Sequence, residues 1–192
     1  MTHVTEDDLD DLEFDTLRTG DHASAARRLS ELAASVSGGV SRAKVLLRAG
    51  EQWQHAGDHA KAAELYRQAI EDGGETYGDP RAYLADALFE LDRADEARDL
   101  IEQIRADEPR DPEVYRTVAE VLYAHGDPEG AHDWATAGVE LVLALRERGE
   151  EDVEIAEDSL EGLLRLRYRT RVDLGRPEDD YDAMLDDLLK TS

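Results

Sequence analysis

The chain has 192 residues, of which 41% are hydrophobic, and a formal net charge of −25 at pH 7. This length and apolar fraction suffice for a buried core, whereas so acidic a chain repels nucleic-acid phosphate. Cysteine is absent, which excludes disulfides and thiol catalysis and is typical of a cytoplasmic protein. The acidic residues 1–15 contain no apolar run, and no stretch approaches the length of a membrane span. We therefore expect neither a signal peptide nor a membrane contact.

Four similar corners recur along the chain. Three have the pattern Gly-Asp-x-x-x-Ala and begin at Gly20, Gly57 and Gly126, and a fourth begins at Asp92. Their intervals of 37, 35 and 34 residues are typical of a stack of helical hairpins. At each corner we expect the first residue to adopt the left-handed conformation that ends one helix. The aspartate after each glycine should then cap the next helix.

In chain order, the corners predict four hairpins and two further helices. Small residues lie five positions after the corners and seven before them, which predicts close helix crossings: Ala25, Ala62, Ala97 and Ala131, with Gly50, Ala85 and Ala119. Residues 35–41 form a polar connector that ends in Ser41, a predicted N-cap. After the fourth corner, a helix should extend to Arg148 and break at residues 149–152. Residues 153–174 and 178–190 are expected to form the last two helices.

The pattern resembles the tetratricopeptide repeat, most closely over residues 43–74. Eight residues there fall on that family's signature spacing: Leu46, Ala49, Gly50, Trp53, Gly57, Ala62, Tyr66 and Ala69. The resemblance implies an all-α, right-handed superhelical stack of hairpins. We expect one domain over residues 1–192, with 1–37 as an N-terminal capping repeat and 41–145 as three recognisable repeats. Residues 146–192 would form a degenerate repeat or C-terminal helical cap.

The resemblance also implies that the first helix of each hairpin lines a concave groove. Six residues before their corners, three consecutive hairpins carry a carboxylate, a set that we call the carboxylate ladder: Glu51, Asp86 and Glu120. The other predicted groove residues are Gln54, Phe89, Tyr123, Asp79, Glu113 and Arg116. Carboxylates with aromatic neighbours favour cationic side chains, by charge and by cation–π contact. The expected ligand is therefore a basic or amphipathic segment of another protein.

Histidines gather near the corners, and they offer a second possible site. Five of them would lie along one edge of the stack: His22, His55, His59, His125 and His132. Imidazoles bind zinc and similar metals, but ligands from successive hairpins are expected to lie too far apart to share an ion. Only His55 and His59 are expected to be able to pair. Ordinary polar turn residues are the favoured interpretation.

The one basic concentration is the run Arg165, Arg167, Arg169 and Arg171. On a helix, Arg165 and Arg169 share one face and Arg167 and Arg171 share another. Glu161 and Asp173 stand four residues from the first pair, so local salt bridges are the favoured interpretation. The alternative is an anion-binding end to the groove.

The sequence carries no phosphate-binding glycine loop, no His-Glu-x-x-His and no nucleophile elbow. We therefore expect no catalytic residue, metal or cofactor, and a protein that is not an enzyme. The favoured function is a scaffold for protein–protein interaction. One alternative is a self-association module whose acidity serves only solubility. A further alternative is a metal-dependent hydrolase at the histidine edge.

Overall fold

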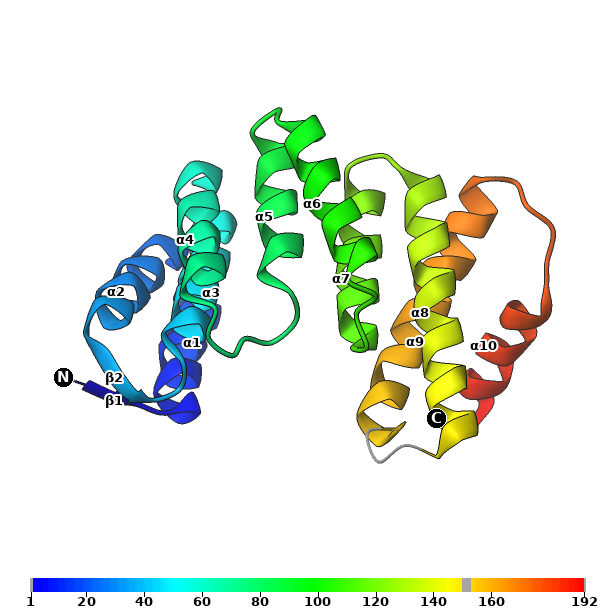
Figure 1. Cartoon of the computed structure of the whole chain (residues 1–192), viewed down its shortest axis with the longest axis horizontal. Coiled ribbons are helices and arrows are strands. Elements are labelled where there is room, and N and C mark those ends of the chain that lie inside the picture. Colours follow the sequence, from blue (N-terminus) through cyan, green and yellow to red (C-terminus); the bar gives the residue numbers. More distant parts are fainter. Residues whose placement is uncertain (1, 150–152, 192) are drawn as a thin grey trace. The chain divides into compact units, whose positions relative to one another are not determined.

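The computed structural model describes residues 2–149 and 153–191, which form ten helices and two short strands (Figure 1). Four helical hairpins follow one another: α1 (Glu6–Thr19) and α2 (His22–Ser35), α3 (Arg42–His55) and α4 (His59–Asp72), α5 (Pro80–Glu90) and α6 (Ala94–Ala106), α7 (Pro112–Ala124) and α8 (Pro128–Arg148). Two further helices, α9 (Val153–Asp173) and α10 (Asp180–Thr191), complete the chain. The predicted all-α class is confirmed. The expected break falls at Gly149, beyond which 150–152 lie outside the described residues.

All four corners form as predicted. Their first residues have positive φ, from +58° at Asp92 to +80° at Gly57. Glycine adopts this conformation without penalty, and the short side chain of Asp tolerates it. The aspartates that follow the glycines cap the next helices; Asp58, for example, accepts the backbone N–H of Lys61 at 3.1 Å. These local signals fix where each hairpin turns.

The small residues near the corners are buried, as expected of tight helix crossings. Gly50 on α3 shows why one crossing tolerates no side chain. A Cβ atom at this position would lie 2.4 Å from the ring of Tyr66 on α4. Tyr66 itself is fully buried, so its ring occupies the space that a larger residue at position 50 would need.

A small parallel sheet at the N-terminus is an unpredicted feature. Strand β1 (Thr2–Val4) pairs with β2 (Val36–Gly39), which occupies the segment expected to be a connector. Val4 is buried in an apolar cluster with Leu9 and Leu29. Strands of three and four residues are too short to show an alternating pattern, so the sequence carries no strand signal here. Ser41 caps α3 as predicted.

The chain divides into two compact units. Unit 1 runs to Ile104 and contains the sheet, α1 to α5 and most of α6; unit 2 begins at Arg105 and contains α7 to α10. In unit 1, α3 packs against α2 and α4, and α4 packs against α5. In unit 2, α9 packs against α7, α8 and α10. No helix within residues 2–149 and 153–191 is both long and apolar enough to cross a bilayer.

Candidate functional site

Glu51 on α3 is a half-buried acid with an altered pKa. Its carboxylate accepts a hydrogen bond from the phenol of Tyr77, in the loop between α4 and α5. Burial raises the pKa of Glu51 to about 7, although the Tyr77 hydrogen bond and the charge of Arg48 oppose the rise. The side chain is therefore close to half-ionised at neutral pH. A cation that arrives beside it would favour the ionised form.

Tyr77, which bonds this acid, belongs to a cluster of three tyrosines. The ring centroids of Tyr66 and Tyr83 lie 5.9 Å apart, and those of Tyr77 and Tyr83 lie 6.1 Å apart at nearly a right angle. The guanidinium of Arg48 lies 5.9 Å from the centre of the Tyr77 ring. Sequence reasoning missed Tyr77 because it lies in a loop between hairpins. Tyr83 could have been found from its place one turn before Asp86 on the same helix.

Gln54 and Asp86 connect the first helices of two hairpins. The side-chain amide of Gln54 on α3 donates to the carboxylate of Asp86 on α5. The amide oxygen of Gln54 accepts a hydrogen bond of 3.0 Å from the phenol of Tyr66 on α4. Phe89 follows Asp86 on α5, and its ring centre lies 5.8 Å from the guanidinium of Arg98. We call Glu51, Gln54, Asp86 and Phe89 the acidic wall of unit 1.

Asp79, a predicted groove residue, also stabilises the start of α5. Its carboxylate caps α5 by accepting the backbone N–H of Arg81 at 2.9 Å. The same carboxylate forms an ion pair of 2.7 Å with the Arg81 guanidinium. The charge of Asp79 is therefore balanced within its own turn.

In unit 2, three predicted groove residues form one ionic group on α7. Arg116 lies between two carboxylates: its guanidinium pairs with Glu113 and lies 2.7 Å from Glu120. These hydrogen bonds and charges raise the pKa of Arg116 above its ordinary value, against the effect of its burial. One cation shared by two acids leaves a single net negative charge. The Glu120 end of the carboxylate ladder is therefore partly neutralised within unit 2.

Tyr123, the remaining predicted groove residue, connects α7 with α9. Its phenol donates a hydrogen bond of 2.7 Å to the carboxylate of Asp173. The guanidinium of Arg169 lies 5.8 Å from the centre of the Tyr123 ring. Tyr123 thus takes part in a polar group made with α9, beside the ionic group of Arg116 on its own helix.

The histidines are arranged differently from the prediction. His22 and His55, from successive hairpins, have ring centroids 5.1 Å apart, so the expectation that only His55 and His59 could pair is wrong. Corners that lie apart can still bring long side chains together. Burial, and then the neighbouring His22, lower the pKa of His55 and favour its neutral ring. Among the described residues, no group of three or more His, Asp or Glu side chains could hold a metal ion.

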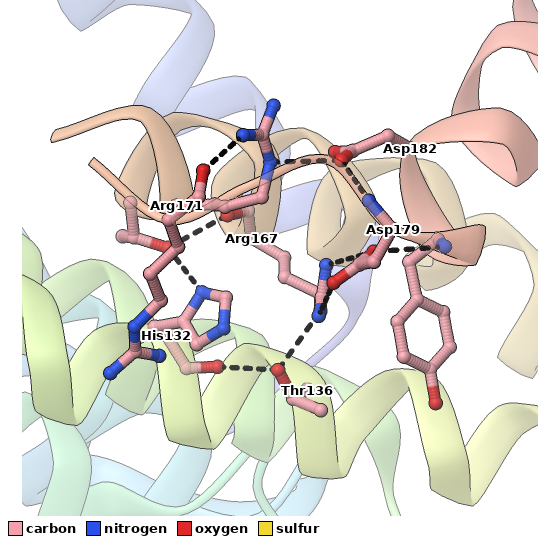
Figure 2. Close-up of polar contacts among 9 residues, drawn as sticks. His132, Thr136, Arg167, Arg171, Asp179 and Asp182 are labelled. Atoms are coloured by element: carbon pink, nitrogen blue, oxygen red, sulfur yellow. Dashed lines mark hydrogen bonds and ion pairs between the residues drawn. The ribbon is translucent and has the colours of Figure 1, made fainter. Parts of the chain in front are cut away.

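His132, also predicted at the edge, lies inside unit 2 instead. It is buried, and its Nδ1 lies 3.2 Å from the hydroxyl of Thr170 on α9 (Figure 2). Burial, with the nearby charges of Arg167 and Arg176, lowers the pKa of His132 and favours a neutral imidazole. The position six residues after a corner is one and a half turns into α8 and faces the packed side of that helix.

The arginine run of α9 divides into two pairs, as its helical spacing predicts. Arg165 forms the expected pair with Glu161, at 2.6 Å. Arg167 and Arg171 are buried and reach α10 and the loop before it: Arg167 pairs with Asp179 at 2.6 Å and Arg171 with Asp182 at 2.8 Å (Figure 2). We call these two ion pairs the α10 clasp. Their acidic partners stand 11 or 12 residues away across a loop, so local spacing does not reveal them.

Comparisons with known families agree with the repeat pattern. Two tetratricopeptide-repeat family models match the chain, one over residues 15–76 and the other over residues 54–121. Together they cover more than half of the chain, from the end of α1 into α7. No curated protein sequence matches it. Such repeats generally mediate protein–protein interaction in non-enzymatic scaffolds. The chain belongs to the tetratricopeptide-repeat family.

Proposed function

We propose that this protein is a non-enzymatic scaffold that binds a basic or amphipathic segment of another protein, with Glu51 and Asp86 of the acidic wall as its main contacts. The observation that supports this most is the hydrogen bond from Gln54 to Asp86. Because it joins α3 to α5, it brings side chains from two hairpins onto one surface. A ligand segment that follows this surface would meet a carboxylate from each hairpin.

The neighbours of these carboxylates also support a cationic ligand. Tyr77 bonds Glu51 and packs against the ring of Tyr83, and Phe89 follows Asp86. Aromatic faces attract ammonium and guanidinium groups, and the 5.9 Å approach of Arg48 to Tyr77 is an internal example. The net charge of −25 adds a long-range attraction for basic segments.

The raised pKa of Glu51 couples this binding to pH. At pH 6 most Glu51 side chains carry a proton, because their pKa is about 7, and a cationic ligand must displace it. At pH 8 the carboxylate is already ionised. The affinity for a basic peptide should therefore rise up to about tenfold between these two pH values. The Glu51→Gln variant should lose most of this dependence.

The experiment that tests the proposal compares peptides of equal length and different charge. Lysine- and arginine-bearing, neutral and acidic peptides would be titrated against the full chain at pH 6 and pH 8. We expect the basic peptides alone to bind measurably, and more tightly at pH 8. Binding of acidic peptides in preference, or basic-peptide affinity unaffected by Asp86→Asn, would refute the proposal.

Glu120, the third member of the predicted carboxylate ladder, belongs to unit 2. Glu120 remains more than half exposed beside Arg116 and can still contact a ligand cation. Because Arg116 already balances part of its charge, Glu120→Gln should weaken binding only modestly. A control variant, Glu64→Gln on the exposed side of α4, removes one charge away from this surface.

A further inference from the structure

A groove between α9 and α10 collects most of the exposed apolar side chains of the described residues. Five large apolar side chains are exposed among the described residues, and three of them line this groove: Tyr168 (46%), Val172 (51%) and Leu189 (42%). Its hollow has a volume of about 520 Å³ and also borders the buried Leu185. Exposed apolar surface gathered in one place is typical of an interaction site. We call this hollow the C-terminal groove.

The α10 clasp explains why the groove stays open. Asp179 and Asp182, which pair with the buried Arg167 and Arg171, lie just before α10 and in its first turn. They fix the start of α10 to α9. Leu185 and Leu189 belong to the later turns of α10, beyond the clasp, where they border the hollow. The groove is therefore held in shape by ionic contacts outside its apolar lining.

The side chains that α9 contributes to the groove change from charged to apolar along the helix. Arg165, Arg169 and Val172 follow one another at intervals of four and three residues, on one face of α9. Arg165 uses its Nε to donate to Glu161, in an exposed pair of a kind that contributes little stability. Arg169 lies beside the ring of Tyr123. Along α9 the lining therefore begins with two cations and continues with Val172, while Asp173 and Asp186 border the hollow beyond them.

Helix α1 carries the complementary sequence of side chains. Asp7, Asp11 and Phe14 follow one another at the same intervals of four and three residues, and all three are exposed. Phe14, at 69%, is the most exposed large apolar side chain of the described residues. If α1 lies parallel to α9, Asp7 meets Arg165, Asp11 meets Arg169, and Phe14 meets Val172 within the hollow.

We infer that the C-terminal groove binds α1 of a second copy of this chain, with Phe14 in the hollow and Asp7 and Asp11 against the two arginines. The surface differs from the acidic wall, which lies on α3 and α5. Because a groove binds a different element of its partner, the contact is head-to-tail and forms rings or open chains.

Sedimentation and light scattering between about 1 µM and about 1 mM protein would test this inference, in the affinity range of weak assemblies. The wild-type mass should rise with concentration. Phe14→Ser and Arg169→Glu should each weaken the association about tenfold or more. Neither change touches a buried side chain, so circular dichroism should be unchanged. Ile70→Ser is the matched control, because it removes an exposed apolar side chain of α4 and should leave the association intact.

Mixing the Phe14→Ser and Arg169→Glu variants and measuring the mass of the complex tests the head-to-tail contact most directly. The Phe14→Ser copy keeps an intact groove and the Arg169→Glu copy keeps an intact α1, so the mixture should form a complex of two chains and stop there. A second variant pair, Asp11→Arg with Arg169→Asp in one chain, should restore the association. A wild-type chain that stays monomeric at all concentrations overturns the inference. This would be the result if α1 bound the groove of its own chain, or if the groove bound only other proteins. Association that is unchanged in both single variants overturns it too.

Discussion

Glu51 shows how burial alters a single acid. Its ordinary pKa is 4.5 and burial raises it to about 7, so the folded chain keeps a proton that the unfolded chain loses. The free energy of unfolding that this proton contributes is fully present below pH 4.5. It decreases as the pH rises from 4.5 and is lost as the pH passes through 7. Above pH 7 the half-buried carboxylate is ionised and costs stability, a cost that a cationic ligand would offset.

Replacing Glu51 by Gln should therefore stabilise the protein most at high pH. We expect the variant to exceed the wild type in free energy of unfolding by about 1–3 kcal/mol at pH 8, with most of that difference gone at pH 5. Thermal unfolding of both proteins across this range would measure it. Equal differences at pH 5 and pH 8 would show that Glu51 titrates at its ordinary value.

The effect of replacing Gly50 on the stability of the protein should depend on which residue stands at position 66. An added Cβ would press on the buried Tyr66 ring, so Gly50→Ala should destabilise the protein by about 1–3 kcal/mol. In a Tyr66→Leu background the ring is gone, and the better helix propensity of alanine, about 1 kcal/mol, should make the same change stabilising. Denaturant unfolding of the four proteins forms the double-mutant cycle. A penalty that is the same in both backgrounds would refute the predicted contact.

Among the elements, α10 depends on charge as well as on apolar packing. Its clasp buries two guanidiniums, and a buried charge that loses its partner is costly. Asp182→Asn should leave Arg171 without its counter-charge and destabilise unit 2 by up to about 3–5 kcal/mol. Amide hydrogen exchange should then accelerate through α10. The neighbouring exposed Asp180→Asn is the control, and equal exchange in both variants would refute the role of the clasp.

Acid should loosen the same element. A hydrogen bond from Arg167 lowers the pKa of Asp179 below 3.8, so this pair stabilises the folded chain above that value. Its contribution is lost as the pH falls through the lowered pKa, when the carboxylate takes up a proton. Protection of the α10 amides, taken relative to their intrinsic exchange rate at each pH, should therefore fall in acid, and an Asp179→Asn variant should show this loss of protection already at neutral pH.

The elements also show how far the sequence alone could lead. Corner glycines, capping aspartates and small residues act within a few positions along the chain, and they correctly predicted the hairpins and their ends. The β1 and β2 strands pair residues more than thirty positions apart without an alternating pattern. The clasp likewise depends on how the loop at residues 174–179 folds back. The periodicity of the sequence predicts neither the pairing of distant strands nor the path of a loop.

The contacts of the predicted binding residues could also be predicted only in part. The repeat offset placed Gln54 and Asp86 in one predicted set, but it did not predict the hydrogen bond between them. It could not show that Arg116 pairs with Glu120, or that Tyr77 reaches Glu51 from a loop. Charge balance depends on side-chain reach as well as on helix position. The carboxylate ladder remains a prediction.

At the scale of the whole molecule, the net charge of −25 attracts any basic ligand, whichever face it finally contacts. A convincing test must therefore separate the position of the charges from their number. The variant Glu51→Gln, Asp86→Asn, Glu120→Gln removes three carboxylates from the ladder. The control Glu31→Gln, Glu64→Gln, Glu71→Gln removes three exposed carboxylates from α2 and α4. At pH 8, where Glu51 is mostly ionised, the two proteins have nearly the same net charge, so the comparison is made at that pH.

The most direct measurement is the association rate constant of a lysine- and arginine-bearing peptide with these two variants and the wild type, at about 0.05 M and about 0.5 M salt. The ladder variant should associate about tenfold more slowly than the wild type at low salt and lose most of its salt dependence. The control should stay close to the wild type, and helicity should be the same in all three proteins. Equal rate constants for the ladder variant and the control would contradict the account, because the charges would then act only through their sum.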